Sequence, residues 1–182
     1  LDMGRFEFSP IAWSVEFFGT FFLVFAIGCS GALSAKGAVD GFFPPFAIGF
    51  TLVLLVFTGG WASGAHYNPA VTIAVFSRSK MSRFDAIAYV ITQILGALCA
   101  ALVVWGLFDF TFAPGPSASF KWYHVFVVEY LWTFVLASAV LHCATEERVQ
   151  PNTFYGFAIG LTVLTGALTF GNVSGAVFNP AV

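Results

Sequence analysis

The fold is decided by the stretch Ser63-Gly64-Ala65-His66-Tyr67-Asn68-Pro69-Ala70-Val71-Thr72. Asn68 is a favourable N-cap, and Pro69 suits the first helical position because its missing N–H would have no intrahelical partner. The apolar run that begins at Ala70 lasts only to Phe76 before basic residues follow. At about 1.5 Å rise per residue, such a helix crosses only about half of a hydrocarbon core roughly 30 Å thick. The stretch therefore predicts a half-helix whose N-terminus points inward.

The same pattern returns at Ser174-Gly175-Ala176-Val177-Phe178-Asn179-Pro180-Ala181-Val182. The segments 46–71 and 157–182 align without a gap and share 14 identities in 26 positions. Upstream of each copy stands a Glu-x-x-x-Thr pattern, at Glu16 in the first half and Glu129 in the second. We therefore expect a single domain, 1–182, made of two repeats at about 11–108 and about 124–182.

Composition predicts that the chain lies in a membrane. It is 59% hydrophobic and 9% charged, with a mean hydropathy of +0.89, which is far above the usual value for a soluble domain. Only Glu16 and Glu129 carry charge inside the segments that are long and apolar enough to cross a bilayer, or nearly so. These segments are Ile11–Leu33, Pro45–Ala62, Ala86–Phe108, Val125–Ala144 and Phe154–Phe170.

Several functional classes are disfavoured by the same sequence. The net charge of −2 and the lack of a long basic run argue against a nucleic-acid partner. Cys29, Cys99 and Cys143 all fall inside predicted spans, which favours packing roles over disulfides or a metal site. Because the sequence offers no nucleophile arrangement, metal cluster or phosphate loop, we expect neither an enzyme nor a cofactor.

The distribution of basic residues predicts the orientation. We expect an integral multi-pass protein of the plasma membrane or a vacuole-like organelle, with its N-terminus in the cytoplasm. In this orientation the loops on the cytoplasmic side carry most of the lysine and arginine. The inside residues would be Arg5, Arg78, Lys80, Arg83 and Arg148, and the outside ones Lys36 and Lys121.

Two repeats with three spans each would be inverted relative to one another, because three is odd. Their half-helices would then approach from opposite faces and meet near the midplane. Both positive dipole ends would face one region and repel cations and protons. Asn68 and Asn179 would present amide N–H groups to a passing oxygen, and a water molecule that accepts from both could not relay a proton onward.

The sequence resembles the aquaporin (major intrinsic protein) family from Glu16 to Val182. Ser-Gly-Ala-His-x-Asn-Pro-Ala-Val-Thr, the second Asn-Pro-Ala, both Glu-x-x-x-Thr patterns and Gln93 stand where the family has them. The resemblance implies an all-α membrane fold with six spanning helices and two re-entrant half-helices, assembled as a lipid-embedded homotetramer with one pore per protomer. The pore motifs would be Asn68, Pro69, Ala70, Asn179, Pro180 and Ala181.

Two departures from the family pattern affect the expected function. The sequence ends inside the second half-helix and lacks the sixth span, which we interpret as an incomplete chain. The family's filter positions correspond to Ile48, Ala167, Ala176 and Val182, where the aromatic residue, histidine and arginine of strict water channels are replaced by smaller apolar groups. Vacuolar-type plant members resemble this sequence at the valine. We therefore expect an orthodox water channel with a wide, apolar filter that also passes ammonia, urea and hydrogen peroxide and excludes protons and ions.

Other interpretations stay open. Glu16 and Glu129 could relay protons, although their matched positions favour a scaffold role shared with Gln93, in which they accept hydrogen bonds from the loops before the half-helices. His66 could sense pH, but a histidine packed beside a turn is the simpler account. An ion-coupled transporter, a glycerol-type facilitator and a non-conducting structural protein are the alternative functions. The gapless repeat shows no added loop of the glycerol type.

Overall fold

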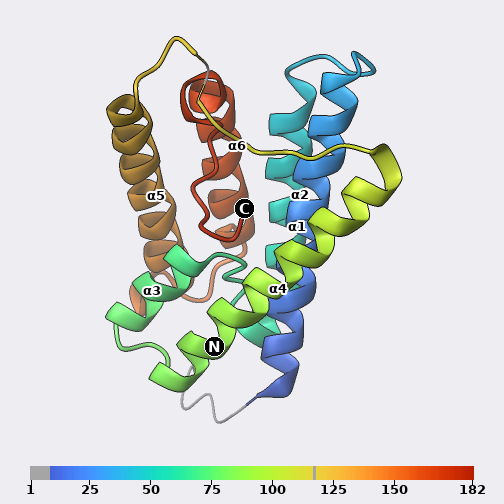
Figure 1. Cartoon of the computed structure of the whole chain (residues 1–182). Coiled ribbons are helices and arrows are strands. Elements are labelled where there is room, and N and C mark those ends of the chain that lie inside the picture. Colours follow the sequence, from blue (N-terminus) through green and yellow to red (C-terminus); the bar gives the residue numbers. More distant parts are fainter. Residues whose placement is uncertain (1–8, 117) are drawn as a thin grey trace.

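The part of the chain that the structure describes folds into six α-helices, five of which are long and apolar enough to span a membrane (Figure 1). This computed structural model describes residues 9–116 and 118–182. The architecture is the all-α membrane fold that the sequence predicts. The helices are α1 (Pro10–Ala35), α2 (Phe43–Ser63), the short α3 (Pro69–Ser77), α4 (Arg83–Phe108), α5 (Trp122–Ala144) and α6 (Tyr155–Ser174), with a 3-10 turn η1 (Glu147–Val149) before α6.

The helix ends follow from local sequence. Ser9 accepts from the Ala12 N–H at the start of α1, and Ser82 accepts from the Asp85 N–H at the start of α4. Helices α2 and α6 both end at a glycine with positive φ, +82° at Gly64 and +91° at Gly175. Such a conformation costs glycine little, so each long helix can stop abruptly before the loop that leads to an Asn-Pro-Ala turn.

The helices pack mainly as α1 against α4 and α2, and α6 against α2 and α5. Small residues permit these contacts, as expected for helices that pack without a hydrophobic driving force in lipid. A Cβ atom on Gly160 would stand 2.7 Å from the carbonyl oxygen of Gly49, and one on Gly96 would stand 2.3 Å from that of Phe17. In Figure 1, α4 crosses in front of α1 and α2, while α5 and α6 stand together on the other side.

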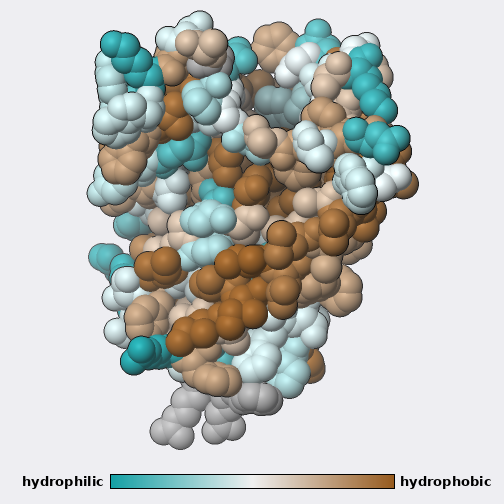
Figure 2. Space-filling model, in the orientation of Figure 1, coloured by the Kyte–Doolittle hydropathy of each residue, from teal (hydrophilic) through white to brown (hydrophobic). Residues whose placement is uncertain are grey.

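The outer surface is apolar around the middle of the molecule. Figure 2 shows hydrophobic side chains along α4 and more hydrophilic ones gathered toward the two ends. This distribution fits a helical bundle whose belt faces hydrocarbon. Exposed residues of α4 include Ile87, Ile91, Leu98 and Leu102.

The loops at one end of the bundle are joined by ion pairs. Arg78, at the end of α3, lies 3.8 Å from Glu146, and Lys80 lies 3.2 Å from Glu147 in η1. Arg148 donates to Glu146 at 2.8 Å, and this hydrogen bond lowers the pKa of the Glu146 carboxyl. Two basic residues of one loop, Arg78 and Lys80, are thus paired with acidic residues of another.

The structure corrects the predicted end of one helix. Helix α6 continues to Ser174, four residues beyond the predicted Phe170, because Gly171 and Asn172 are accommodated within its last turn. The second half-helix is present only as a turn at residues 180–181, in which the Val182 N–H donates to the Asn179 carbonyl at 3.1 Å. Three residues after Asn179 are too few for more than one hydrogen-bonded turn.

Candidate pore

The two Asn-Pro-Ala turns meet inside the bundle and are joined by hydrogen bonds. The Asn68 Oδ1 accepts from the Ala70 N–H at 2.9 Å, and the Asn179 Oδ1 accepts from the Ala181 N–H at 3.0 Å. The Asn68 Nδ2 donates to the carbonyl oxygen of Phe178 at 2.8 Å. In return, the Asn179 Nδ2 donates to the carbonyl oxygen of Tyr67 at 2.9 Å. Each amide is therefore fixed by a cap within its own repeat and by a bond to the other repeat.

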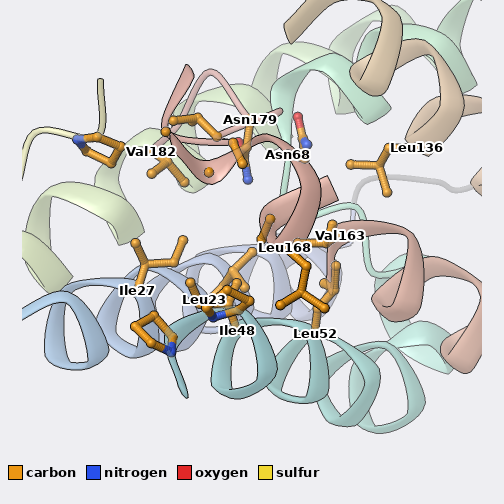
Figure 3. Close-up of a pocket in the computed structure, with 18 of the residues that line it drawn as sticks. Leu23, Ile27, Ile48, Leu52, Asn68, Leu136, Val163, Leu168, Asn179 and Val182 are labelled. Carbon is orange, nitrogen blue, oxygen red and sulfur yellow. The ribbon is translucent and has the colours of Figure 1, made fainter. Parts of the chain in front are cut away.

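This arrangement leaves each asparagine with a second amide N–H. The amide nitrogen carries two donors, and the bond across the repeats uses one of them. Both asparagines are buried and both line a cavity of about 550 Å³. In Figure 3, Asn68 and Asn179 lie on one side of this cavity, and Leu23, Ile48 and Leu52 lie on the opposite side. The cavity thus has a polar wall and an apolar wall.

The four predicted filter residues line the same cavity. Ile48 comes from α2 and Ala167 from α6, while Ala176 and Val182 come from the loop after α6 and the final turn. Four separate segments thus bring them together around one space. None of these four residues carries a charge or a hydrogen-bonding side chain.

Glu16 lies behind the first turn and is fully buried. Its carboxylate accepts from the Ser63 hydroxyl at 2.7 Å and from the backbone N–H groups of His66 and Tyr67 at 2.9 and 2.7 Å. The Gln93 Nε2 of α4 adds a fourth bond at 2.8 Å. Two consecutive N–H groups of the loop between α2 and α3 are therefore bound to a single side chain of α1.

Glu129 occupies the corresponding place in the second repeat. It accepts from the Ser174 hydroxyl and from the N–H groups of Val177 and Phe178, the latter two at 3.1 and 2.7 Å. Unlike Glu16 it is only partly buried, and it lines an open groove with Thr133, Asn179 and Pro180. Within residues 9–116 and 118–182, no glutamine donates to it as Gln93 does to Glu16.

His66 is buried beside the first turn, and its ring lines the cavity. The His66 Nδ1 lies 3.1 Å from the Thr72 hydroxyl oxygen, which donates to the Asn68 carbonyl and accepts from Gln93. Because the hydroxyl has only one hydrogen, these bonds coexist when the Nδ1 of His66 carries a proton and donates to Thr72. His66 therefore belongs to the network that supports the turn, and it also faces the cavity.

The cavity wall holds few ionisable groups. Asp40, His66 and Tyr67 are the ionisable residues among the described residues that line it, and neither Glu16 nor Glu129 is part of the wall. The described residues also contain no cluster of three or more histidine, cysteine, aspartate or glutamate side chains that could hold a metal ion.

Sequence reasoning missed the two residues that accept the amide bonds, Tyr67 and Phe178. Each carbonyl oxygen belongs to the residue just before an asparagine, and the side chains at both positions are aromatic. The repeat alignment contains this signal, but the alignment by itself does not show that each carbonyl reaches the opposite asparagine.

Comparison with known proteins finds a matching family model and related sequences. The family model described as "Major intrinsic protein" matches residues 9–182. The chain is 37% identical over 173 residues to "Nodulin-26" from Glycine max, covering 91% of this chain and 62% of the relative. It is 34% identical over 192 residues to "Aquaporin AqpM" from Methanothermobacter thermautotrophicus, covering 91% of this chain and 78% of the relative.

A maize relative and a solved structure agree with these matches. "Aquaporin NIP1-1" from Zea mays is 37% identical over 172 residues, covering 91% of this chain and 60% of the relative. The chain thus spans about 60% of the length of the nodulin-26-type relatives. The X-ray structure of the aquaglyceroporin from Plasmodium falciparum has the same fold, with a TM-score of 0.84 and 24% identity over 93% of this chain and 76% of that one.

Proposed function

Because this chain belongs to the major intrinsic protein (aquaporin) family, we propose that it forms a passive channel for water and small neutral solutes. The observation that carries the proposal is the pair of cross-bonded amides, Asn68 and Asn179, on the wall of one cavity. A water molecule beside them can accept from the N–H that each amide keeps free. Because that water then points its own hydrogens away from both donors, it cannot pass a proton along a file of water molecules.

Charge repulsion supports proton and ion exclusion. Helix α3 begins beside Asn68, so its N-terminus places roughly half a positive charge near the cavity. The described part of the second turn directs the Ala181 N–H to Asn179 in the same way that Ala70 is bound to Asn68. We propose that the two turns together disfavour cations at this point.

The filter decides which solutes pass. Ile48, Ala167, Ala176 and Val182 are apolar and include two alanines, so the passage is not narrowed by a large charged side chain. Ammonia, urea and hydrogen peroxide are compact and lose few hydrogen bonds in such a passage, whereas large polyols lose more. We propose this relaxed selectivity, with the vacuolar-type filter as its sequence precedent.

A glycerol-type facilitator is the second candidate. A cavity of about 550 Å³ with one apolar and one polar wall also suits a small polyol, which has carbon atoms on one side and hydroxyl groups on the other. The structural neighbour from Plasmodium falciparum is itself named an aquaglyceroporin. Glycerol therefore belongs among the solutes that are tested.

An ion-coupled transporter would need charged or carbonyl-rich ion sites at the midplane. The carboxylates of Glu16 and Glu129 instead accept backbone N–H groups behind the loops, outside the cavity wall. We propose that these two residues, with Gln93 and His66, act as scaffold. We also propose a homotetramer with the N-terminus in the cytoplasm, in the plasma membrane or a vacuole-like organelle.

The test is stopped-flow permeability of proteoliposomes that contain the full-length protein. We expect rapid water flux, measurable urea and ammonia flux that does not saturate, and no dependence on an ion gradient. Proton flux, followed with an internal pH dye, should stay at the level of empty vesicles. Absence of water and solute flux would contradict the proposal, and flux that requires an ion gradient would favour the transporter.

A further inference from the structure

We propose that the aromatic side chains of Tyr67 and Phe178 are positioning residues that hold the pore amides of the opposite repeat. This inference rests on the proposed channel function, in which Asn68 and Asn179 meet the permeating molecule. The carbonyl oxygens of Tyr67 and Phe178 accept from the Asn179 and Asn68 side chains respectively, so both residues act on that molecule through the amides, and Tyr67 also lines the cavity. Whatever fixes those two carbonyl groups therefore fixes the amides.

Both residues have a backbone conformation that side chains rarely adopt. The φ angle is +47° at Tyr67 and +48° at Phe178, in the left-handed region. This region costs a residue other than glycine roughly 1–2 kcal/mol, so the conformation persists only where the surroundings enforce it. The neighbouring N–H groups supply part of that support, because Glu16 binds the Tyr67 N–H and Glu129 binds the Phe178 N–H.

In the first repeat, the packing of the Tyr67 ring supplies the remaining support for this backbone conformation. It occupies a slot between α1 and α2 made by two glycines. A Cβ atom on Gly19 would stand 2.0 Å from the ring carbon Cε1, and one on Gly59 would stand 1.9 Å from the hydroxyl oxygen. That hydroxyl donates to the Leu55 carbonyl at 3.0 Å. The ring is thus locked along its length and is 1% exposed.

The Phe178 ring packs against different residues in the second repeat. It lies beside Trp132 of α5, with ring centroids 6.3 Å apart, and a Cβ atom on Gly166 of α6 would stand 2.6 Å from its Cε2. Trp132 is itself fixed because its indole N–H donates to the Thr162 carbonyl at 2.9 Å. Phe178 is 1% exposed, as Tyr67 is.

The residues that pack around the Tyr67 and Phe178 rings differ in size at matched positions of the two repeats. In the alignment of the repeats, Gly19 and Gly59 correspond to Trp132 and Phe170, while Leu55 corresponds to Gly166. The glycines that make room for the ring therefore stand at different aligned positions in the two repeats. In both repeats, however, the backbone carbonyl of the aromatic residue accepts from the amide of the opposite repeat. The two rings pack against different residues, yet both carbonyl groups reach the opposite amide. We infer that positioning the carbonyl group is the role that the two packing sites share.

The test compares three variants of the full-length protein. Gly59→Ala places a methyl group against the Tyr67 hydroxyl and should displace the ring. Gly59→Ala combined with Tyr67→Phe removes the atom that clashes, while the contact between the new methyl group and Val15 stays the same in both. Gly60→Ala is the matched control, since a Cβ atom there meets no atom closer than 3.6 Å.

The first readout is the NMR signal of the Asn179 side-chain amide in lipid nanodiscs. Gly59→Ala should shift or broaden this signal although the substitution lies in the other repeat, the double variant should restore it, and Gly60→Ala should leave it unchanged. The second readout is the ratio of proton flux to water flux in proteoliposomes. Gly59→Ala should raise this ratio by about tenfold, the size expected when one net hydrogen bond is lost.

The outcomes separate this inference from the channel proposal. An unchanged Asn179 signal in Gly59→Ala, or a double variant that restores nothing, would overturn the positioning role even if the wild type conducts. A wild type without water flux would contradict the channel, while the amide signal would still test the positioning role. If Gly59→Ala does not assemble, Tyr67→Ala against Tyr67→Phe gives the same decision, because only Tyr67→Ala empties the slot.

Discussion

The two repeats bind equivalent loops with the same residue type but with different surroundings. Glu16 is fully buried and accepts four hydrogen bonds, one of them from Gln93 of α4. Glu129 is partly exposed and accepts three, without a counterpart of Gln93 in the part of the chain that the structure describes. The comparison shows that each repeat supplies its own carboxylate and the loop N–H groups that bind it. The burial of Glu16 depends in addition on helix α4.

The largest effect is expected for Glu16→Leu. This change leaves three donors of the loop and the Gln93 amide without their acceptor in a dry interior, at about 1–3 kcal/mol for each unsatisfied group. We expect the variant to lose its monodisperse form in detergent. Glu16→Gln keeps one acceptor oxygen and should be milder. Equal thermal stability of wild type and Glu16→Leu would show that the carboxylate does not support the loop.

A smaller effect is expected for Glu129→Leu. Three donors lose their acceptor here, against four at Glu16. We expect a loss of about 1–3 kcal/mol in stability for each of these donors, and Glu129→Gln should retain much of the transport. Thermal unfolding of the two leucine variants, measured side by side, decides the comparison. A larger loss for Glu129→Leu than for Glu16→Leu would contradict the role that we assign to α4.

Asn68→Ala should cost less stability and change transport more. It removes the cap of α3, worth about 0.5–2 kcal/mol, together with a cavity donor and the bond to Phe178. Water flux should fall or proton flux should rise in protein that is correctly folded. Asn179→Ala is the matched variant in the other repeat and should behave alike. Unchanged water and proton flux in both variants would place the centre of the pore elsewhere.

The smallest effect concerns the ion pairs between the loops of the two repeats. Arg148 and Arg78 hold Glu146, and the hydrogen bond from Arg148 lowers the pKa of its carboxyl below the ordinary 4.5. A lowered folded-state pKa gives a contribution that is present above the unfolded value and fades as pH falls through the folded one. Glu146→Gln should therefore lower the melting temperature slightly at neutral pH, and the gap should close in acid. A gap that widens in acid would reverse this sign.

The sequence predicted much of this site because its signals are local or repeated. The cap by Asn68 follows from its neighbours, and the carboxylate contacts of Glu16 and Glu129 follow from their matched positions before matched loops. The end of α6 was predicted too early, at Phe170, because the apolar run stops there, whereas the helix ends where Gly175 adopts a positive φ.

The packing sites of the Tyr67 and Phe178 rings could not be predicted in the same way. Gly19 and Gly59 lie where the two repeats differ, so the repeat alignment gave them no weight. Their role depends on how closely α1 and α2 approach the Tyr67 ring, which only the three-dimensional packing determines. The crossed bonds of the amides are likewise a product of the meeting of two distant loops.

The most direct measurement of the central claim alters the cavity wall and follows several solutes. Val182→Arg combined with Ala167→His adds bulk and positive charge at two residues that line the cavity. If the cavity is the pore, urea and ammonia flux into proteoliposomes should fall far more than water flux. Leu102→Met, on the exposed face of α4, is the control and should change neither. Equal urea, ammonia and water flux in wild type and double variant would show that these molecules do not cross the protein through this cavity.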